Sequence, residues 1–251
     1  MIYITGDCHG EFQRFDIQIF PEQKEMTKDD FCIIVGDFGG VWDKDAEGSL
    51  ERRLLDWLEG KPFTTLFVDG NHENYDRLDA YPVEQWNGGK VHRIRSSVIH
   101  LMRGQIFELD GVSFFAFGGA RSHDIDGGIL EPDAPDFEIR KRKNERNDIS
   151  YRVNHVNWWE REMPSEEEMR EGKVNLAAHG NKVDFIVTHC CASSTQVIVG
   201  GSRYKPDRLT SYFEEIRQNV SFKKWFFGHY HDNLNVSPQE ILIYEQIIRI
   251  R

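Results

Sequence analysis

Acidic, histidine and asparagine side chains gather in five short blocks of this chain. The blocks are GDCHG at residues 6–10, GDFGG at 36–40, DGNHE at 69–73, THC around His189, and GHYH at 228–231. Carboxylate and amide oxygens together with imidazole nitrogens form a ligand set that suits manganese, iron or zinc better than copper(I) or an iron–sulfur cluster. The blocks therefore predict a metal centre that needs no thiolate ligand.

Two of the blocks carry ligand candidates at alternate positions. Asp7 and His9 are two residues apart, and so are His229 and His231. On extended backbone, residues two apart point to the same side of the chain. Each pair is therefore expected to present two ligands to one site, although an isolated Asp after a strand is also a common turn former or helix cap.

The blocks follow short apolar segments that we interpret as buried strands. Strands are predicted at residues 2–5, 31–35, 65–68, 184–188 and 225–228, and helices at 50–58 and near 207–217. In parallel α/β sheets, ligands collect at the carboxyl ends of the strands. The loops after the first three strands are therefore expected to converge in space.

The middle of the chain shows a different pattern. Four short strands with tight connections are predicted at residues 91–94, 98–102, 105–109 and 112–117, which indicates a second, more antiparallel sheet. After them the pattern loosens into a polar segment that holds the basic run RKRKNER and a helix opened by a capping box of Ser165 and Glu168. We interpret the chain as one domain, residues 1–251, with an insertion at about 121–182 beside the active face.

Composition limits the classes of protein to which the chain can belong. Hydrophobic residues make up 39% and charged residues 29% of the 251 residues, so the chain can bury a core, and no apolar stretch approaches the length of a membrane span. The 31 basic and 42 acidic residues give a net charge of −11, which argues against nucleic acid as a general partner. The four cysteines have no framework spacing, so a reducing, cytoplasmic setting is expected. The oligomeric state stays open.

The five blocks, in this order, resemble the calcineurin-like metallophosphoesterase superfamily over residues 1 to about 232. The resemblance implies an α/β fold, a four-layer α/β/β/α sandwich of two sheets flanked by helices. It also implies two divalent metal ions, which could be manganese, iron, zinc or nickel. One ion would be held by Asp7, His9 and His231, the second by Asn71, His189 and His229, with Asp37 bridging both. For His189 taken alone, a hydrogen-bonded core histidine is the competing interpretation.

The same resemblance implies a hydrolase acting on a phosphorylated substrate. We expect hydrolysis of a phosphomonoester by a hydroxide that bridges the two metals, with His72 as general acid or phosphate contact. The alternative is a phosphodiesterase acting on nucleotides or cyclic nucleotides. A non-catalytic binding module on the same fold is a third hypothesis, and it is disfavoured because every ligand position and His72 are filled.

One feature departs from the serine/threonine phosphatase branch that the blocks otherwise resemble. The second block there continues through an aspartate and a phosphate-binding arginine, whereas here Gly39, Gly40 and Val41 follow. Another cation should then face the phosphate oxygens. We expect it to be Arg121, which follows the predicted strand at 112–117, with His123 beside it as a second substrate contact. The competing interpretation is that Arg121 forms a structural salt bridge.

Overall fold

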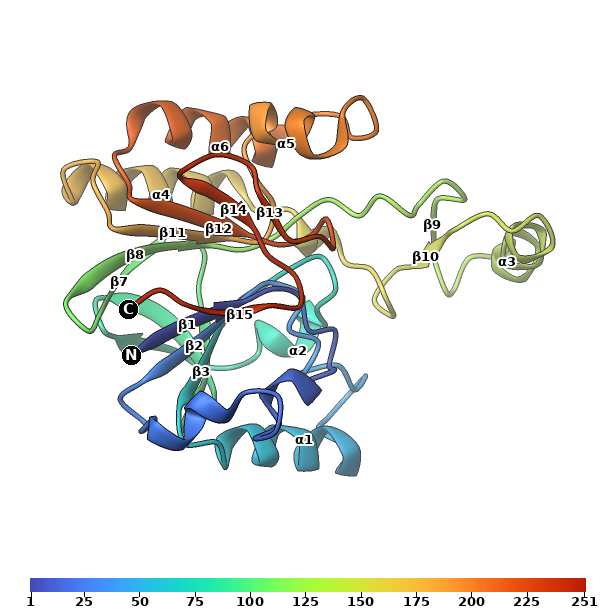
Figure 1. The fold of residues 1–251 in the computed structure, drawn as a ribbon. Helices are drawn as coiled ribbons and strands as arrows, with labels where there is room; N and C mark the ends of the chain where they lie inside the picture. The colour runs from blue at the N-terminus through green and yellow to red at the C-terminus, as the bar shows by residue number, and fades with distance from the viewer.

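Two β-sheets pack face to face and helices cover both outer faces in the computed structural model, which describes residues 1–251 (Figure 1). A core of 19 buried residues, including Ile33 and Phe114, lies between the sheets. Two further cores of 17 residues each lie between a sheet and its helices. The predicted four-layer α/β sandwich is therefore confirmed.

The first sheet has seven strands around a parallel centre. Its order is β15 (Ile247–Arg249), β1 (Ile2–Thr5), β2 (Phe31–Val35), β3 (Thr64–Val68), β6 (Val98–Leu101), β5 (Gly89–Arg95) and β4 (Val83–Trp86). Strands β1, β2, β3 and β6 run parallel. Side chains alternate, so Ile33 packs between the sheets while Ile34 faces the outer helix.

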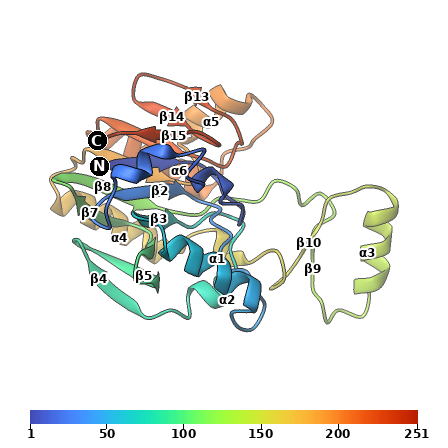
Figure 2. The same cartoon turned by 60° about the horizontal axis from the view of Figure 1, so that its bottom comes forward.

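Helix α1 (Ser49–Glu59) covers the outer face of this sheet, next to the β4–β5 hairpin (Figure 2). Its Leu55 and Leu58, one turn apart, are fully buried. The short helix α2 (Tyr75–Leu78) follows the third block, and two 3-10 helices, η1 (Gln13–Phe15) and η2 (Pro21–Glu25), lie between β1 and β2.

The second sheet has six strands and is mainly parallel. Its order is β13 (Leu234–Asn235), β14 (Glu240–Leu242), β12 (Lys224–Phe227), β11 (Phe185–Thr188), β8 (Val112–Phe117) and β7 (Gln105–Leu109). Strands β8, β11, β12 and β14 are parallel neighbours. Helices α4 (Glu166–Ala178), α5 (Ser193–Gly200) and α6 (Arg208–Asn219) cover its outer side (Figure 1).

The prediction that the four middle strands form one antiparallel sheet is wrong. β5 and β6 pair with each other and join the first sheet beside β3, whereas β7 and β8 pair and join the second sheet beside β11. Each hairpin is local and readable from the sequence. The sheet that each hairpin joins depends on long-range pairing, which the strand pattern does not specify.

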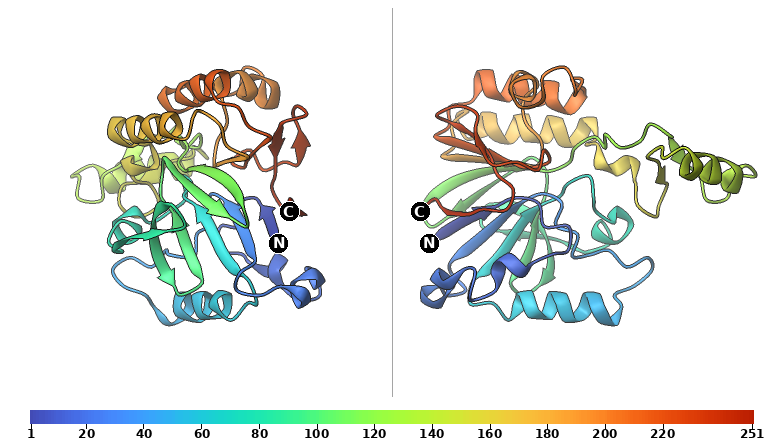
Figure 3. Two further views of the ribbon diagram at one scale, coloured as in Figure 1. Left: turned by 90° about the vertical axis from the view of Figure 1, so that its left-hand side faces the viewer. Right: turned by 45° about the vertical axis from the view of Figure 1, so that its right-hand side comes forward.

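The segment at 121–182 separates into two structurally different parts. Its last helix, α4, has the predicted capping box at Ser165 and Glu168 and buries Met169 and Leu176 against the second sheet. The preceding residues, 121–159, form an arm that projects from the strand ends and carries β9 (Ile129–Leu130), α3 (Phe137–Arg146) and β10 (Arg152–Val153) (Figure 3). The 3-10 helix η3 (Glu160–Glu162) returns the chain to the body.

Both chain termini lie at the end of the molecule opposite the arm, where β15 pairs antiparallel with β1 (Figure 1). No helix of the chain combines the length and the apolar character that a membrane crossing requires.

Candidate metal centre

The first group of ligand candidates comes from the loops after β1, β2 and β12. His9 Nε2 lies 3.1 Å from His231 Nε2 and 3.7 Å from Asp37 Oδ2. His231 Nε2 lies 3.2 Å from Asp7 Oδ2. Ligand atoms of these four residues all lie within 4.8 Å of one another. The expected convergence of strand-end loops therefore extends to a loop from the second sheet.

The second group shares Asp37 with the first. His189 Nε2, at the end of β11, lies 3.3 Å from Asp37 Oδ2 and 3.2 Å from Asn71 Oδ1. The His229 ring lies 5.1 Å, between centroids, from the His189 ring. All seven residues predicted as ligands are thus brought together, with the Asp37 carboxylate between the two groups.

The separations within these groups match those of ligands around a common ion. Nitrogen and oxygen ligands lie about 2.0–2.2 Å from zinc, so two ligands at right or tetrahedral angles are about 2.8–3.6 Å apart. The four shortest separations here are 3.1–3.3 Å. Imidazole, carboxylate and amide are also the donor types that divalent manganese, iron or zinc accepts. The residues present therefore fit divalent metal ions.

The backbone presents these residues in a way that the sequence reasoning did not foresee. His9, Asp37, His229 and His231 have positive φ angles of 50°, 45°, 70° and 50°. The expectation that each pair lies on extended backbone is therefore wrong, since left-handed residues in tight turns aim the rings. Such conformations are uncommon for residues other than glycine and tend to occur at functional sites.

Two glycines of the blocks make room for carboxylates from neighbouring loops. A Cβ atom on Gly228 would lie 2.0 Å from Asp7 Oδ1, and one on Gly70 would lie 2.0 Å from Asp37 Oδ1. Neither contact is sterically allowed, so each position requires glycine. Glycine in these blocks therefore serves the close approach of two loops, in addition to turning the chain.

Backbone groups fix the orientation of the candidate ligands. The His229 N–H donates to Asp7 Oδ2 at 3.0 Å, and the His72 N–H donates to Asp37 Oδ1 at 2.7 Å. His189 Nδ1 lies 2.9 Å from the carbonyl oxygen of Val35. When Nδ1 donates to that carbonyl, Nε2 is the nitrogen that faces Asp37 and is free to bind a metal.

Burial and charge set the protonation of these side chains before a metal binds. Burial alone lowers the pKa of His189, but the carboxylates of Asp37 and Asp7 outweigh it and raise the pKa to about 10. Burial raises the pKa of Asp37, but the neighbouring His189 outweighs the effect of burial and holds this pKa far below its usual value. Burial and His189 hold the pKa of His229 well below its ordinary value. A metal ion would take the place of the proton on His189.

His72 lies beside the first group and is paired with a residue from the arm. Its ring is 5.3 Å from the His9 ring, between centroids, and Arg152 Nη2 lies 3.4 Å from its Nε2. Arg152 is itself bound to Asp124, with Nε 3.0 Å from Oδ1. Burial and the charge of Arg152 lower the pKa of His72, and Asp37 raises it; the net result is a pKa below the ordinary value. The arm thus supplies a guanidinium at the edge of the centre.

The two residues predicted as substrate contacts differ in their surroundings. The His123 ring lies 4.9 Å from the His229 ring and 4.5 Å from the Tyr204 ring, between centroids. Arg121 is exposed, and its side chain forms no hydrogen bond or ion pair, so the salt bridge considered as an alternative is absent. The structure thus brings His123 to the second group and leaves the exposed Arg121 unpaired.

Sequence reasoning missed several residues that support the centre. Arg152 lies on a two-residue strand in a segment without apolar periodicity, where nothing marks one arginine among many. Glu73 accepts the backbone N–H groups of Phe38, at 2.7 Å, and Gly39, at 3.2 Å, and so ties the third block to the second. Glu73 could have been found from the sequence, because it stands in the block DGNHE next to Asn71 and His72. Arg14 binds the carbonyl oxygen of Asp7 at 2.7 Å.

A further chain of hydrogen bonds orients Asn71. Its Nδ2 donates to Ser122 Oγ at 3.3 Å, and Ser122 Oγ donates to Glu162 Oε2 at 2.6 Å. Because the amide nitrogen is engaged by Ser122, the amide oxygen is the atom that faces His189. Ser122 and Glu162 are buried at the two ends of the arm, which the sequence pattern left unassigned.

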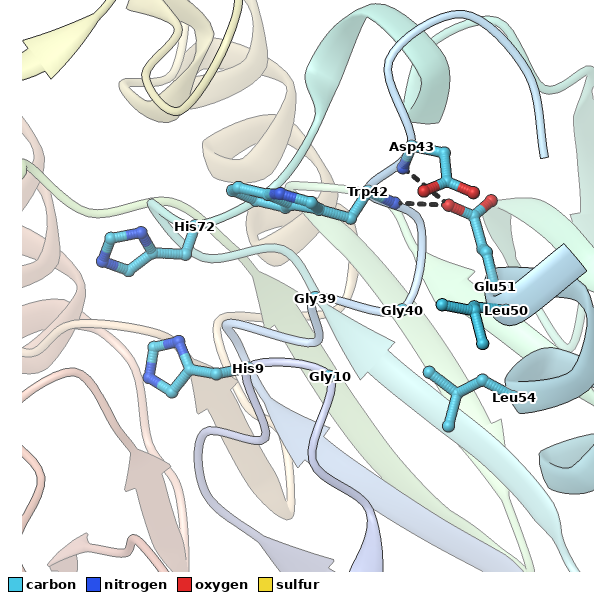
Figure 4. Close-up of a pocket in the computed structure, with 10 residues that line it drawn as sticks. All are labelled: His9, Gly10, Gly39, Gly40, Trp42, Asp43, Leu50, Glu51, Leu54 and His72. Carbon is cyan, nitrogen blue, oxygen red and sulfur yellow. Dashed lines mark hydrogen bonds between the residues drawn. The ribbon is translucent and has the colours of Figure 1, made fainter. Parts of the chain in front are cut away.

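A cavity of about 480 Å³ opens next to His9 and His72 (Figure 4). It runs over the backbone of Gly39 and Gly40 to Leu50 at the start of α1. The centre is therefore continuous with a space large enough for a small organic group.

Two stacked sheets with ligand-bearing loops meeting at their strand ends define a metallophosphoesterase-type α/β protein. A family model described as calcineurin-like phosphoesterase matches residues 1–233, and the chain belongs to this family.

Two curated relatives are similar over part of the chain. Lariat debranching enzyme A of Xenopus laevis is 28% identical over 145 residues, and lariat debranching enzyme of Danio rerio is 25% identical over 146 residues. Each match covers 52% of this chain but only 26% and 24%, respectively, of those proteins. The similarity therefore spans about a quarter of the length of these relatives.

Proposed function

We propose that this protein is a dinuclear metal-dependent phosphoesterase that hydrolyses a phosphomonoester. The observation that carries the proposal is the shared carboxylate: Asp37 Oδ2 lies 3.7 Å from His9 Nε2 in one group and 3.3 Å from His189 Nε2 in the other. The proposed ligands are Asp7, His9, His231 and Asp37 for one ion, and Asn71, His189, His229 and Asp37 for the second. When bound, such ions polarise phosphoryl oxygens and activate water as the nucleophile.

His72 is proposed as the general acid. Its backbone N–H holds Asp37, and its ring stands outside both ligand groups beside His9. A ring at this position can deliver a proton to the oxygen that leaves phosphorus. Burial and Arg152 both lower the pKa of His72, whereas a bound phosphate would add negative charge and favour the protonated ring.

Arg152 is proposed as the phosphate contact that takes the place of the missing phosphatase-branch arginine. Asp124 binds the Nε and Nη2 edge of this guanidinium, which leaves the edge formed by Nη1 and Nη2 to donate to phosphate oxygens, and Nη2 lies 3.4 Å from His72 Nε2. Arg121 and His123 are proposed as further substrate contacts on the side of the second group. Their support is the position of His123 against His229 and the unpaired guanidinium of Arg121.

A phosphodiesterase is the second candidate function. It is favoured by the two relatives, which are named for debranching lariats, since opening a branch point in a nucleic acid requires cleavage of a phosphodiester. The net charge of −11 argues against a general affinity for nucleic acid. Small nucleotide diesters are therefore the substrates that we propose for this second function.

The two functions separate in a substrate panel. Phosphomonoesters and diesters with the same leaving group are assayed with manganese, nickel and zinc, and the ratio of kcat/KM values is compared. We expect the monoester to be preferred. A preference for the diester would favour the second candidate, and no metal-dependent hydrolysis of either would overturn both.

A further inference from the structure

The cavity beside His72 has a polar end formed by histidines and an apolar wall on α1. His9 and His72 form the polar end, and Leu50 and Leu54 on α1 form the opposite wall (Figure 4). Its volume of about 480 Å³ lies within the range of about 300–1,000 Å³ that is typical of small-molecule sites. It therefore has room for an organic group attached to a phosphate at the metal centre.

Several large hydrophobic side chains that line the cavity remain exposed. Trp42 is 37% exposed and Leu50 is 72% exposed, although the chain buries most of its large apolar residues. Both side chains line the same space. Exposed apolar residues that line one cavity are typical of a binding site rather than of ordinary surface.

The indole of Trp42 is supported from one side and open on another. Its ring packs edge-on against Trp159, with centroids 5.9 Å apart and an interplanar angle of 76°. Trp159 is buried and donates its Nε1–H to Asp76 Oδ2 at 2.7 Å, so it is fixed in place. The orientation of the Trp42 ring is therefore stabilised by Trp159, and the part of the ring that lines the cavity can pack against another aromatic ring.

The charges around the cavity disfavour a second phosphate. No lysine or arginine lines it, and its two carboxylates, from Asp43 and Glu51, stand at the end near α1. Glu51 accepts the backbone N–H groups of Trp42 and Asp43 and forms an ion pair with Arg77 at 2.7 Å, so its negative charge is already balanced by a cation. A neutral, planar group fits these walls better than an anionic one.

We infer that this cavity binds the leaving group of the substrate, and that this leaving group carries a neutral aromatic ring, as in a nucleoside or an aryl alcohol. The inference rests on the proposed function, because His72, at the polar end, would protonate the leaving oxygen. A phosphate at the metal centre then places its ester oxygen near His72. The rest of the leaving group extends over Gly39 and Gly40 to Trp42 and Leu50.

Filling the cavity should remove the preference for aromatic leaving groups. Leu50→Trp places a larger side chain at an exposed helical position, and Val174→Trp, at a residue 60% exposed on α4, is the matched control. Values of kcat/KM are measured for adenosine 5′-monophosphate, phenyl phosphate and glycerol phosphate. In Leu50→Trp, the ratio of an aromatic substrate to glycerol phosphate should fall by about 2- to 10-fold, as expected for a lost ring contact, and Val174→Trp should keep the wild-type ratio.

The two aromatic substrates distinguish the source of the ring. A larger fall for adenosine monophosphate assigns the cavity to nucleosides, and a larger fall for phenyl phosphate assigns it to aryl esters. An unchanged ratio in Leu50→Trp overturns the inference.

Binding without turnover separates this inference from the proposed function. Equilibrium dialysis measures adenosine and phenol binding to wild type, Leu50→Trp, Trp42→Ala and Val174→Trp. Weaker binding of at least one ring compound in both cavity variants, with Val174→Trp unaffected, supports the inference even if no ester is hydrolysed. Absence of binding to wild type at millimolar concentration, or equal binding by all four proteins, overturns it.

Discussion

The strand-end loops and the arm both contribute residues to one site, but the loop residues Asp37 and His189 are buried at the ends of central strands, whereas the arm projects from the body of the protein. The side chains of Asp37 and His189 are 1% and 0% exposed, and each lies at the end of a strand in the centre of a sheet. Arg152 stands on a two-residue strand of the projecting arm, and its partner Asp124 is 48% exposed. The loops fix the candidate metal ligands, whereas the arm brings a cation to His72. Metal binding and substrate recognition should therefore be separable by mutation.

The largest effect that would sharpen this separation is expected at His72. His72→Ala should keep its metal ions, because the ring lies outside both ligand groups and only the backbone N–H holds Asp37. Activity on alkyl phosphates should fall by about 10²- to 10⁴-fold, the usual contribution of general acid catalysis. Activity on nitrophenyl phosphate should fall much less, since that leaving group needs no proton. An equal loss on both substrates would instead assign phosphate binding to His72.

A smaller effect is expected at the arm. Arg152→Ala should lower kcat/KM by about 10- to 100-fold, as for loss of a charged hydrogen bond. Arg152→Lys should recover little of it, because an ammonium cannot make the planar two-point contact. Metal content, measured by inductively coupled plasma mass spectrometry, should stay at the wild-type value in both variants. Loss of metal in either variant would contradict the claim that metal binding depends on the strand-end loops and not on the arm.

Two further arginines serve as comparisons for Arg152. Arg121→Ala and Arg121→Lys test the other proposed phosphate contact, and Arg142→Ala is a control because its side chain is 80% exposed on α3. Unchanged efficiency in both Arg121 variants would remove that residue from the site. A loss in Arg142→Ala equal to that in Arg152→Ala would show that the effect is not specific to the guanidinium beside His72.

The last effect concerns the pH dependence of metal binding at the buried loops. In the metal-free chain the pKa of His189 is raised to about 10, so the ring is protonated at neutral pH and loses its proton only as the pH rises through that value. A metal ion must displace this proton, and its affinity should therefore fall as the pH falls, by up to about tenfold per unit between about pH 9 and 7.

Calorimetry in buffers of different ionisation enthalpy checks this prediction. Metal binding should release at least one proton per chain at about pH 8, and His189→Asn should release fewer. An affinity that does not change with pH would contradict the raised pKa of His189.

The ligand blocks could be predicted because their signal is local. Asp7, Asp37 and His189 each follow a short apolar strand, and parallel strands deliver their carboxyl ends to one edge. The turn geometry could not be predicted in the same way. Positive φ angles at His9 and His231 depend on contacts between loops that are far apart in the sequence.

The arm and the sheet partners could not be predicted, for a related reason. Arg152 and Glu162 gain their roles from contacts with His72 and Ser122, residues 80 and 40 positions away, and no periodicity marks them. The assignment of β5 and β6 to the first sheet likewise depends on pairing with β3. Local patterns specify strands and hairpins, whereas these contacts are set by the whole fold.

Metal stoichiometry of Asp37→Ala tests the central claim most directly, since this carboxylate stands between the two ligand groups. Wild type should bind two divalent ions per chain, and Asp37→Ala should weaken both by more than about 10-fold, whereas His231→Ala should weaken mainly one. Asp124→Ala, which removes a carboxylate of the arm, should keep both at wild-type affinity. Saturation of wild type at one ion, or retention of two ions at unchanged affinity in Asp37→Ala, would contradict the dinuclear account.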